Sequence, residues 1–122
     1  MTVFREFHFE AAHSLPEAPP GHKCRRVHGH SYRLVVHVRG RVQPRTGWVM
    51  DFADLRAVVD PLIKELDHQY LNDLEGLSCP TAEVIVRWCW RRLRPGLPGL
   101  SKLELFETAR CGCAYEGEDE GG

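Results

Sequence analysis

The sequence predicts a single α+β domain, in which an antiparallel four-stranded sheet carries two helices on one face. Four segments have the composition or the period-two alternation of strands, namely 3–11, 32–39, 102–108 and 113–117. Between the two pairs of strands, segments 52–66 and 82–93 are predicted helices. The element order is therefore ββααββ, which is typical of an antiparallel sheet with both helices inserted in the middle of the chain.

The alternation is clearest in the second predicted strand, 32–39. Successive side chains of a strand point to opposite faces, so every second residue lies on the same face. One face of this strand carries Tyr32, Leu34, Val36 and Val38. The opposite face carries Arg33, Val35, His37 and Arg39. The first strand, 3–11, shows the same kind of alternation, and the two strands are expected to pair.

The first helix is predicted from an apolar stripe at helical spacing. The stripe consists of Leu55, Val58, Val59, Leu62, Ile63 and Leu66. Asp51 is a suitable N-cap for this helix, and Thr81 is a suitable N-cap for the second. Pro61 stands inside the stripe, where the missing N–H and the bulk of the ring are expected to kink or split the helix.

A long connection joins the first two predicted strands, from about 14 to 27, and contains Pro16, Pro19, Pro20 and Gly21. Loops of this length inside a compact domain are usually functional. The sheet itself has two free edges, and bare strand edges invite pairing with another chain. We therefore expect the protein to form oligomers through its strand edges.

Composition and charge restrict the classes of protein to which this chain can belong. The 122 residues are 43% hydrophobic and 27% charged with a formal net charge of −1, so no bulk charge favours nucleic acid or a membrane surface. The start of the chain has no apolar signal segment, and the five cysteines are an odd number. We expect reduced thiols and a cytoplasmic location. One domain is predicted over 1–117, followed by a disordered acidic tail over 118–122.

Three histidines are placed to meet at one end of the predicted hairpin. His28 and His30 alternate at the start of the second strand, so both side chains project from the same face. His13 stands at the end of the first strand and lies beside them if the two strands pair around the long loop. Three imidazoles are the ligand set of a catalytic zinc site that keeps one position open. The alternative is that they are surface histidines without a metal.

Cys24 precedes the His-x-His pair by four residues and admits three interpretations. As a fourth zinc ligand, it would close the site and make it structural. As a free thiol beside bound zinc, flanked by Lys23, Arg25 and Arg26, it would act as a thiolate base or nucleophile. The third interpretation, a small buried residue, fits poorly with these charged neighbours. We favour the thiolate, because structural zinc sites usually contain paired cysteines.

Asp67 and His68 follow the first predicted helix directly. An aspartate beside a histidine can hold one tautomer of the imidazole and stabilise its charged form, as in pairs of a catalytic base and its orienting group. Residues that are adjacent in sequence seldom reach this geometry unaided. Capping of the helix end is therefore the alternative role for the pair.

Glu107 interrupts an otherwise apolar strand face that contains Leu103 and Leu105. Burying a carboxylate without a partner costs free energy. Two explanations follow from this. Either the strand face reaches solvent at this position, or Glu107 binds a ligand that presents paired N–H donors.

Together these pieces resemble the 6-pyruvoyl-tetrahydropterin synthase superfamily, and most of all its bacterial branch, the 6-carboxytetrahydropterin synthases of queuosine biosynthesis. The matching motifs run in order through nearly the whole chain: "FHFEAAHSLP", "GHKCRRVHGHSY", "TGWVMDFADL", "LDHQYLND", "PTAEV" and "ETARCGCAYEGE". The four-residue spacing in "CRRVHGH" is similar to that of the carboxy branch. The family's tunnelling fold implies ββααββ subunits that close a barrel as trimers. Two trimers stack into a homohexamer, with active sites at subunit interfaces.

The resemblance implies a metal centre and a catalytic thiol. His13, His28 and His30 match the zinc ligands of the family, with one Zn²⁺ per subunit. Cys24 matches its catalytic cysteine. On this basis the metal position that the protein leaves open would face the substrate, and the thiol would stand beside it.

The resemblance also implies roles for four residues that lie later in the chain than these histidines and Cys24. Asp67 and His68 match the remaining pair of the family's catalytic triad. Glu107 matches the acid that anchors the pyrimidine edge of the pterin. The backbone around Thr81 lies where the family makes further pterin contacts. One departure is Gln69, which stands where some relatives have a second histidine.

The implied activity is that of a carbon–carbon lyase. It converts 7,8-dihydroneopterin triphosphate to 6-carboxy-5,6,7,8-tetrahydropterin and releases acetaldehyde and triphosphate. The alternative inside the family is the pyruvoyl synthase, which eliminates triphosphate to give a different product. Two alternatives lie outside the family: a three-histidine zinc hydrolase or hydrase, and a zinc protein without catalytic activity whose site Cys24 closes. The basic residues beside Cys24 would contact the triphosphate or form a solvated loop.

Overall fold

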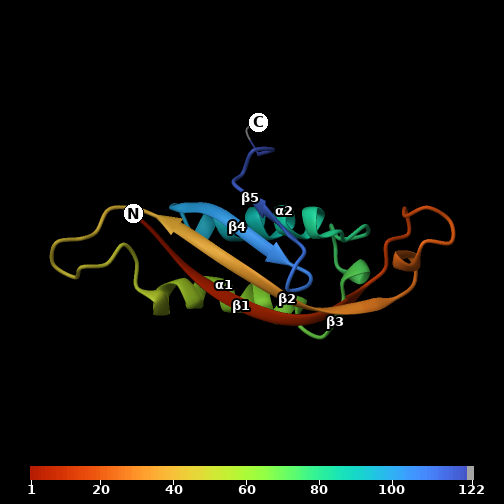
Figure 1. Cartoon of the computed structure of the whole chain (residues 1–122). Helices are drawn as coiled ribbons and strands as arrows, with labels where there is room; N and C mark the ends of the chain where they lie inside the picture. The colour runs from red at the N-terminus through yellow and green to blue at the C-terminus, as the bar shows by residue number, and fades with distance from the viewer. Residues whose placement is uncertain (121–122) are drawn as a thin grey trace.

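The computed structural model describes residues 1–120 and shows the predicted α+β fold (Figure 1). Five strands form one sheet, and both helices pack against one of its faces. The helices and strands are β1 (Thr2–His13), β2 (His28–Arg39), α1 (Phe52–Leu66), β3 (Gln69–Tyr70), α2 (Ala82–Leu93), β4 (Leu100–Phe106) and β5 (Gly112–Tyr115). Three short 3-10 segments complete the order, namely η1 (Lys23–Arg25), η2 (Leu71–Asp73) and η3 (Arg94–Gly96).

The sheet differs from the predicted one by a single short strand. Its order is β3-β1-β2-β4-β5, and β3 runs parallel to β1 through Ala11 and Ala12, whereas the other neighbours are antiparallel. A strand of two residues carries no alternation that a sequence pattern can reveal. It forms because the chain that leaves α1 returns to the end of β1. The four predicted strands and their antiparallel pairing are confirmed.

β1 and β2 form a long hairpin whose register determines what meets at its closed end (Figure 1). Thr2 lies opposite Arg39 at the open end, and His13 lies opposite His28 where the connecting loop begins and ends. The pairing is regular between these positions. Side chains from the two strand ends are therefore held side by side on a rigid part of the sheet.

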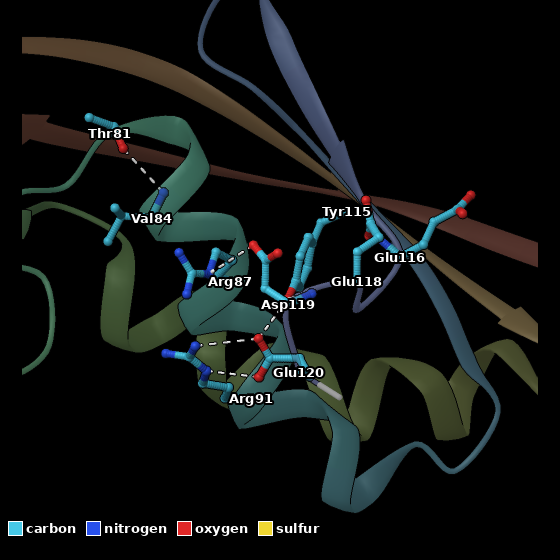
Figure 2. Close-up of polar contacts among 9 residues, drawn as sticks. All are labelled: Thr81, Val84, Arg87, Arg91, Tyr115, Glu116, Glu118, Asp119 and Glu120. Atoms are coloured by element: carbon cyan, nitrogen blue, oxygen red, sulfur yellow. Dashed lines mark hydrogen bonds and ion pairs between the residues drawn. The ribbon is translucent and has the colours of Figure 1, made fainter. Parts of the chain in front are cut away.

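The helices start at the predicted caps. Asp51 and Thr81 each accept a hydrogen bond from a backbone N–H in the first turn of their helix, and Figure 2 shows the bond from Val84 to Thr81. Pro61, however, does not split α1, which continues through it as one element. Pro61 and Ala57, whose carbonyl loses its helical partner, are both exposed. Water can bond that carbonyl, which explains why the helix continues.

The two faces of the sheet have different chemistry. The face under the helices is apolar and almost completely buried, with Tyr32, Leu34, Val36, Leu103 and Leu105 at its centre. The opposite face carries polar pairs, including the ion pair of Arg33 with Glu6 at 2.7 Å and the hydrogen bond between His37 and Glu104 at 2.7 Å. The hydrophobic core therefore lies between the helices and one face of the sheet, whereas the other face is polar and partly exposed to solvent.

Both edges of the sheet have backbone groups available for pairing. Because β3 covers only Ala11 and Ala12, the stretch 2–9 of β1 has no strand neighbour on that side within residues 1–120. β5 likewise has a neighbour on one side only, in the same part of the chain. Edges of this kind favour association with another chain. The expectation of oligomers through strand edges remains a prediction.

The acidic composition predicts disorder over 118–122, but two residues of this tail contact α2 (Figure 2). Asp119 lies 3.7 Å from Nε of Arg87, and Glu120 accepts a hydrogen bond from Nε of Arg91 at 2.8 Å. The hydroxyl of Tyr115 also donates to Glu120 at 2.5 Å. Both contacts are made with basic side chains of α2. Disorder of the tail remains a prediction. Residues 121–122 lie outside the described part of the chain.

Candidate metal centre and active site

The closed end of the β1–β2 hairpin brings three histidines together. The register places His13 opposite His28, and His30 follows two residues later on the same face of β2. One ring nitrogen of each histidine lies within 4.8 Å of the other two. This spacing allows one ion to contact all three imidazoles, so the group could hold a metal ion.

Backbone carbonyls orient two of the three rings. Nδ1 of His13 lies 2.7 Å from the carbonyl oxygen of Pro80, and Nδ1 of His28 lies 2.8 Å from that of Arg26. A carbonyl oxygen only accepts hydrogen bonds, so each Nδ1 carries the hydrogen and leaves the lone pair of Nε2 for a metal. Sequence patterns did not indicate Pro80, which reaches the cluster only through the turn before α2.

The burial of the cluster also fits a metal ion. Nε2 of His13 and Nε2 of His30 are buried and have no hydrogen-bond partner among the described residues. Leaving buried polar atoms without a partner costs free energy, which a bound cation would recover. Burial lowers the pKa of His13 and so favours the neutral imidazole, the form that binds metals.

A cavity of about 510 Å³ lies beside this cluster. Its walls include the three histidines together with Cys24 from the β1–β2 loop and Glu107 from the β4–β5 connection. Oε2 of Glu107 is 3.8 Å from Nε2 of His30, close to the candidate metal position. Three separate segments of the chain thus contribute imidazoles, a thiol and a carboxylate to one cavity.

Hydrogen bonds hold the backbone of Cys24 on both sides. Its N–H donates to Nδ1 of His22 at 3.0 Å, and its carbonyl accepts from the N–H of Leu15 at 2.7 Å. The thiol is partly exposed. Among residues 1–120, Cys24 does not belong to the group whose ligand atoms lie within metal-binding reach of one another. This arrangement favours a thiol beside the metal over a closed structural site.

Thr81 has the capping role that the sequence predicts, and no contact with either cavity. Its hydroxyl caps α2, and its side chain lines neither this cavity nor its neighbour. The next two residues, Ala82 and Glu83, line an adjacent cavity of about 230 Å³ that shares Glu107 and Cys111 with the first. The start of α2 therefore lies next to Glu107, although contact of Thr81 itself with a ligand stays a prediction.

Asp67 and His68 form a close pair at the end of α1. Oδ2 of Asp67 lies 2.8 Å from Nδ1 of His68, and its Oδ1 accepts from the N–H of Glu10 at 2.8 Å. The hydrogen bond from Glu10, and then that from His68, lowers the pKa of Asp67. His68 has φ +59°, a left-handed conformation that is uncommon for residues other than glycine. The geometry is that of an orienting carboxylate and its imidazole.

This pair does not share a cavity with Cys24 within the described residues of one chain. His68 lines a different cavity of about 530 Å³, which also contains Glu10 and His30. Cys24 and Glu107 line the first cavity, and His30 is the one residue common to the two. The two groups that the motifs assign to proton transfer therefore line different cavities of one chain.

Comparison with known proteins gives consistent matches. Residues 2–118 match the family described as 6-pyruvoyl tetrahydropterin synthase. The chain is 46% identical over 119 residues to the 6-carboxy-5,6,7,8-tetrahydropterin synthase of Synechocystis sp., covering 93% of this chain and 91% of the relative. It is 39% identical over 111 residues to the dihydroneopterin monophosphate aldolase of Pyrococcus furiosus, covering 88% and 90%.

A solved structure agrees with the sequence matches. The 6-pyruvoyl tetrahydropterin synthase of Caenorhabditis elegans superposes with a TM-score of 0.89 at 28% identity, covering 97% of this chain and 96% of that protein. The resemblance inferred from the motifs is thus confirmed at the level of the family and of the fold. The chain belongs to the 6-pyruvoyl tetrahydropterin synthase family.

Proposed function

We propose that this protein is a zinc-dependent carbon–carbon lyase of queuosine biosynthesis. It would convert 7,8-dihydroneopterin triphosphate and water to 6-carboxy-5,6,7,8-tetrahydropterin, acetaldehyde and triphosphate. The observation that carries the proposal is the cavity in which a three-histidine centre meets Cys24, a thiol outside the metal-binding group. The 46% identity to the Synechocystis 6-carboxy-5,6,7,8-tetrahydropterin synthase supports this product over the pyruvoyl product.

Binding of the substrate is assigned to the histidine cluster and Glu107. His13, His28 and His30 would hold the zinc, which supplies Lewis acidity toward the hydroxyl groups of the substrate side chain. Glu107 would accept hydrogen bonds from the pyrimidine edge of the pterin, because an ionised carboxylate binds two adjacent N–H donors well. Its position beside His30 would direct the substrate side chain toward the thiol.

Proton transfer is assigned to two groups. The thiolate of Cys24 would remove a proton from carbon in the substrate side chain. His68 would exchange protons with the side-chain oxygens. Because hydrogen bonds from Glu10 and His68 lower its pKa, the Asp67 carboxylate is ionised at neutral pH. It would hold Nδ1–H of His68 and leave Nε2 for proton transfer.

We further propose that a second copy of the chain completes each active site, in a homohexamer built from two trimers. Two observations support this. Cys24 and His68 line different cavities of one chain. If both act on the same substrate molecule, the thiol and the imidazole would come from two different copies of the chain. The open edges of β1 and β5 offer the means of joining copies.

Mixing two inactive variants tests the shared site. Cys24→Ala and His68→Ala chains, refolded together in equal amounts, are expected to regain activity in about a quarter of their sites. In a random assembly, about half of the sites receive an intact thiol, and about half of those also receive an intact imidazole from the neighbouring copy. Steady-state rates and co-purification of two affinity tags measure this. A mixture of Cys24→Ala with the double variant is the control, since it lacks the thiol everywhere. Mixed oligomers without recovered activity would contradict the shared site.

Product analysis tests the activity itself. Zinc-loaded protein and 7,8-dihydroneopterin triphosphate are expected to give 6-carboxy-5,6,7,8-tetrahydropterin and acetaldehyde in equal amounts, as measured by mass spectrometry and an aldehyde assay. A 6-pyruvoyl product without acetaldehyde would instead support the pyruvoyl synthase. Absence of turnover would contradict both. Parallel assays with 7,8-dihydroneopterin monophosphate test for the activity in the name of the Pyrococcus relative, which is a dihydroneopterin monophosphate aldolase.

We propose a cytoplasmic location for the enzyme. Within residues 1–120, no helix is both long enough and apolar enough to cross a membrane. All five cysteines are free thiols, which is the usual state in a reducing compartment. Chemical labelling of thiols in fractionated cells would test this location.

A further inference from the structure

We infer that Asn72 is a positioning residue of the metal centre, whose side-chain amide fixes the backbone directly after the ligand His13 and thereby sets the affinity for zinc. The inference rests on the proposed zinc centre, but the hydrogen bonds that carry it belong to the folded chain itself. Asn72 lies in η2 and lines none of the three cavities next to the histidine cluster. It would therefore act through His13 rather than on the substrate.

One side-chain amide satisfies both backbone groups of Ser14, the residue that follows His13. The N–H of Ser14 donates to Oδ1 of Asn72 at 2.9 Å, and Nδ2 of Asn72 donates to the carbonyl of Ser14 at 2.9 Å. Ser14 is only 9% exposed, so leaving these two groups without partners would cost free energy. Two bonds in opposite directions hold this segment in place and in orientation.

The amide continues the sheet at the point where the backbone of β3 leaves it. β3 runs parallel to the end of β1, with Ala12 opposite Tyr70. Two residues further along each segment, Ser14 would lie opposite Asn72, but the chain has turned into η2 there. The side chain of Asn72 supplies the two bonds that a longer β3 would make. An asparagine suits this place because its amide both donates and accepts.

The same amide reaches the segment that orients the His13 ring. Nδ2 of Asn72 lies 3.4 Å from the carbonyl oxygen of Ser78, in the turn that contains Pro80. The carbonyl of Pro80 is the group that lies 2.7 Å from Nδ1 of His13. Asn72 thus connects the backbone after the ligand with the turn that fixes its ring. Since three imidazoles must reach one ion together, a displacement of His13 would weaken metal binding.

Zinc affinity, measured by competition with a chromophoric chelator, tests the inference without reference to activity. Asn72→Ala is expected to weaken zinc binding by roughly 10–100-fold, as for loss of other outer partners of a zinc ligand. Asn72→Asp has nearly the same shape, keeps the acceptor and loses the donor, so it should also weaken zinc binding and serves if the alanine variant does not fold. The visible spectrum of the cobalt(II)-loaded protein should change in both variants, because it reports the geometry of the ligands.

Two control variants separate positioning from a general loss of stability. Asp73→Ala is the matched control, because Asp73 is an exposed residue of the same 3-10 segment whose side chain forms no hydrogen bond within residues 1–120. Asp51→Ala removes the side-chain cap of α1 and lines none of the three cavities next to the histidine cluster. It should lower the Tm of the metal-free protein. Both controls should keep the zinc affinity and the cobalt spectrum of the wild type.

Wild-type zinc affinity in both Asn72 variants, or an equal loss in Asp51→Ala, would overturn the inference. A wild-type protein that binds no zinc would overturn it together with the proposed centre. Failure of the proposed reaction alone gives a different result. In that case zinc binding depends on Asn72 as expected, whereas the zinc-loaded wild type forms no product from 7,8-dihydroneopterin triphosphate.

Discussion

Replacing Cys24 with alanine is expected to reduce the rate of product formation by about 10²–10⁴-fold, the usual contribution of a positioned acid or base. The zinc content should not change, because Cys24 lies outside the group of histidine nitrogens that approach one another. Metal analysis together with steady-state kinetics separates the two effects. A variant that loses activity and keeps its zinc places the thiol beside the metal.

Two further measurements sharpen this prediction. X-ray absorption at the zinc edge should show nitrogen and oxygen in the first shell of the resting protein and no sulfur. Cys111→Ala is the matched control, since Cys111 lines the same cavity but its carbonyl, rather than its thiol, bonds the backbone of Glu107. This variant should keep most of its activity. A zinc–sulfur distance in the wild type, or full activity in Cys24→Ala, would contradict the thiolate interpretation.

The meeting of the three histidines was predictable because it depends on two short-range rules. Alternation places His28 and His30 on one face of β2, and pairing of adjacent strands brings His13 opposite His28. Any regular hairpin around the 14–27 loop produces this arrangement. The N-caps were predictable for a similar reason, because a cap bond joins residues within the same turn.

The features that sequence patterns missed depend on contacts between distant segments. Pro80 orients His13 across 67 positions of the chain, and a backbone carbonyl has no residue type that could reveal it. The pairing of β3 with β1 likewise depends on where α1 ends. Pro61 was expected to kink or split α1 because the pattern does not show that the helix exposes this side to water.

The pair formed by Asp67 and His68 shows where local reasoning stops. The dipeptide alone is compatible with capping of α1 or with an orienting carboxylate. The structure shows both roles: the N–H of Asp67 donates to the carbonyl of Ile63 at 2.8 Å as the C-cap of α1. The N–H of Glu10 donates to Oδ1 of Asp67, while Oδ2 contacts His68. The contact with Glu10 spans 57 positions. The division of Cys24 and His68 between two cavities is equally hidden from sequence patterns, because it depends on the three-dimensional path of the loops.

Replacing His28 with alanine should remove both the bound zinc and the activity. Loss of even an outer partner of a zinc ligand commonly costs about 10–100-fold in metal affinity, so loss of a ligand should cost at least as much. His28 is a better choice than His13, because its side chain is only partly buried while His13 is buried. Replacement of His28 therefore leaves a smaller defect in the packing of the metal-free protein.

Thermal unfolding with and without added zinc measures this prediction independently of activity. A ligand that binds only the folded protein adds about 2.7 kcal/mol to the free energy of unfolding when its free concentration is roughly 100 times Kd. The wild type should therefore gain on the order of 10 °C in Tm under these conditions, whereas His28→Ala should gain almost nothing. His8→Ala is the matched control, because His8 is an exposed histidine on the opposite face of the sheet, 3.6 Å from Glu6. If His28→Ala kept the zinc-dependent rise in Tm, or if His8→Ala lost it, the metal would be bound elsewhere than at the hairpin end.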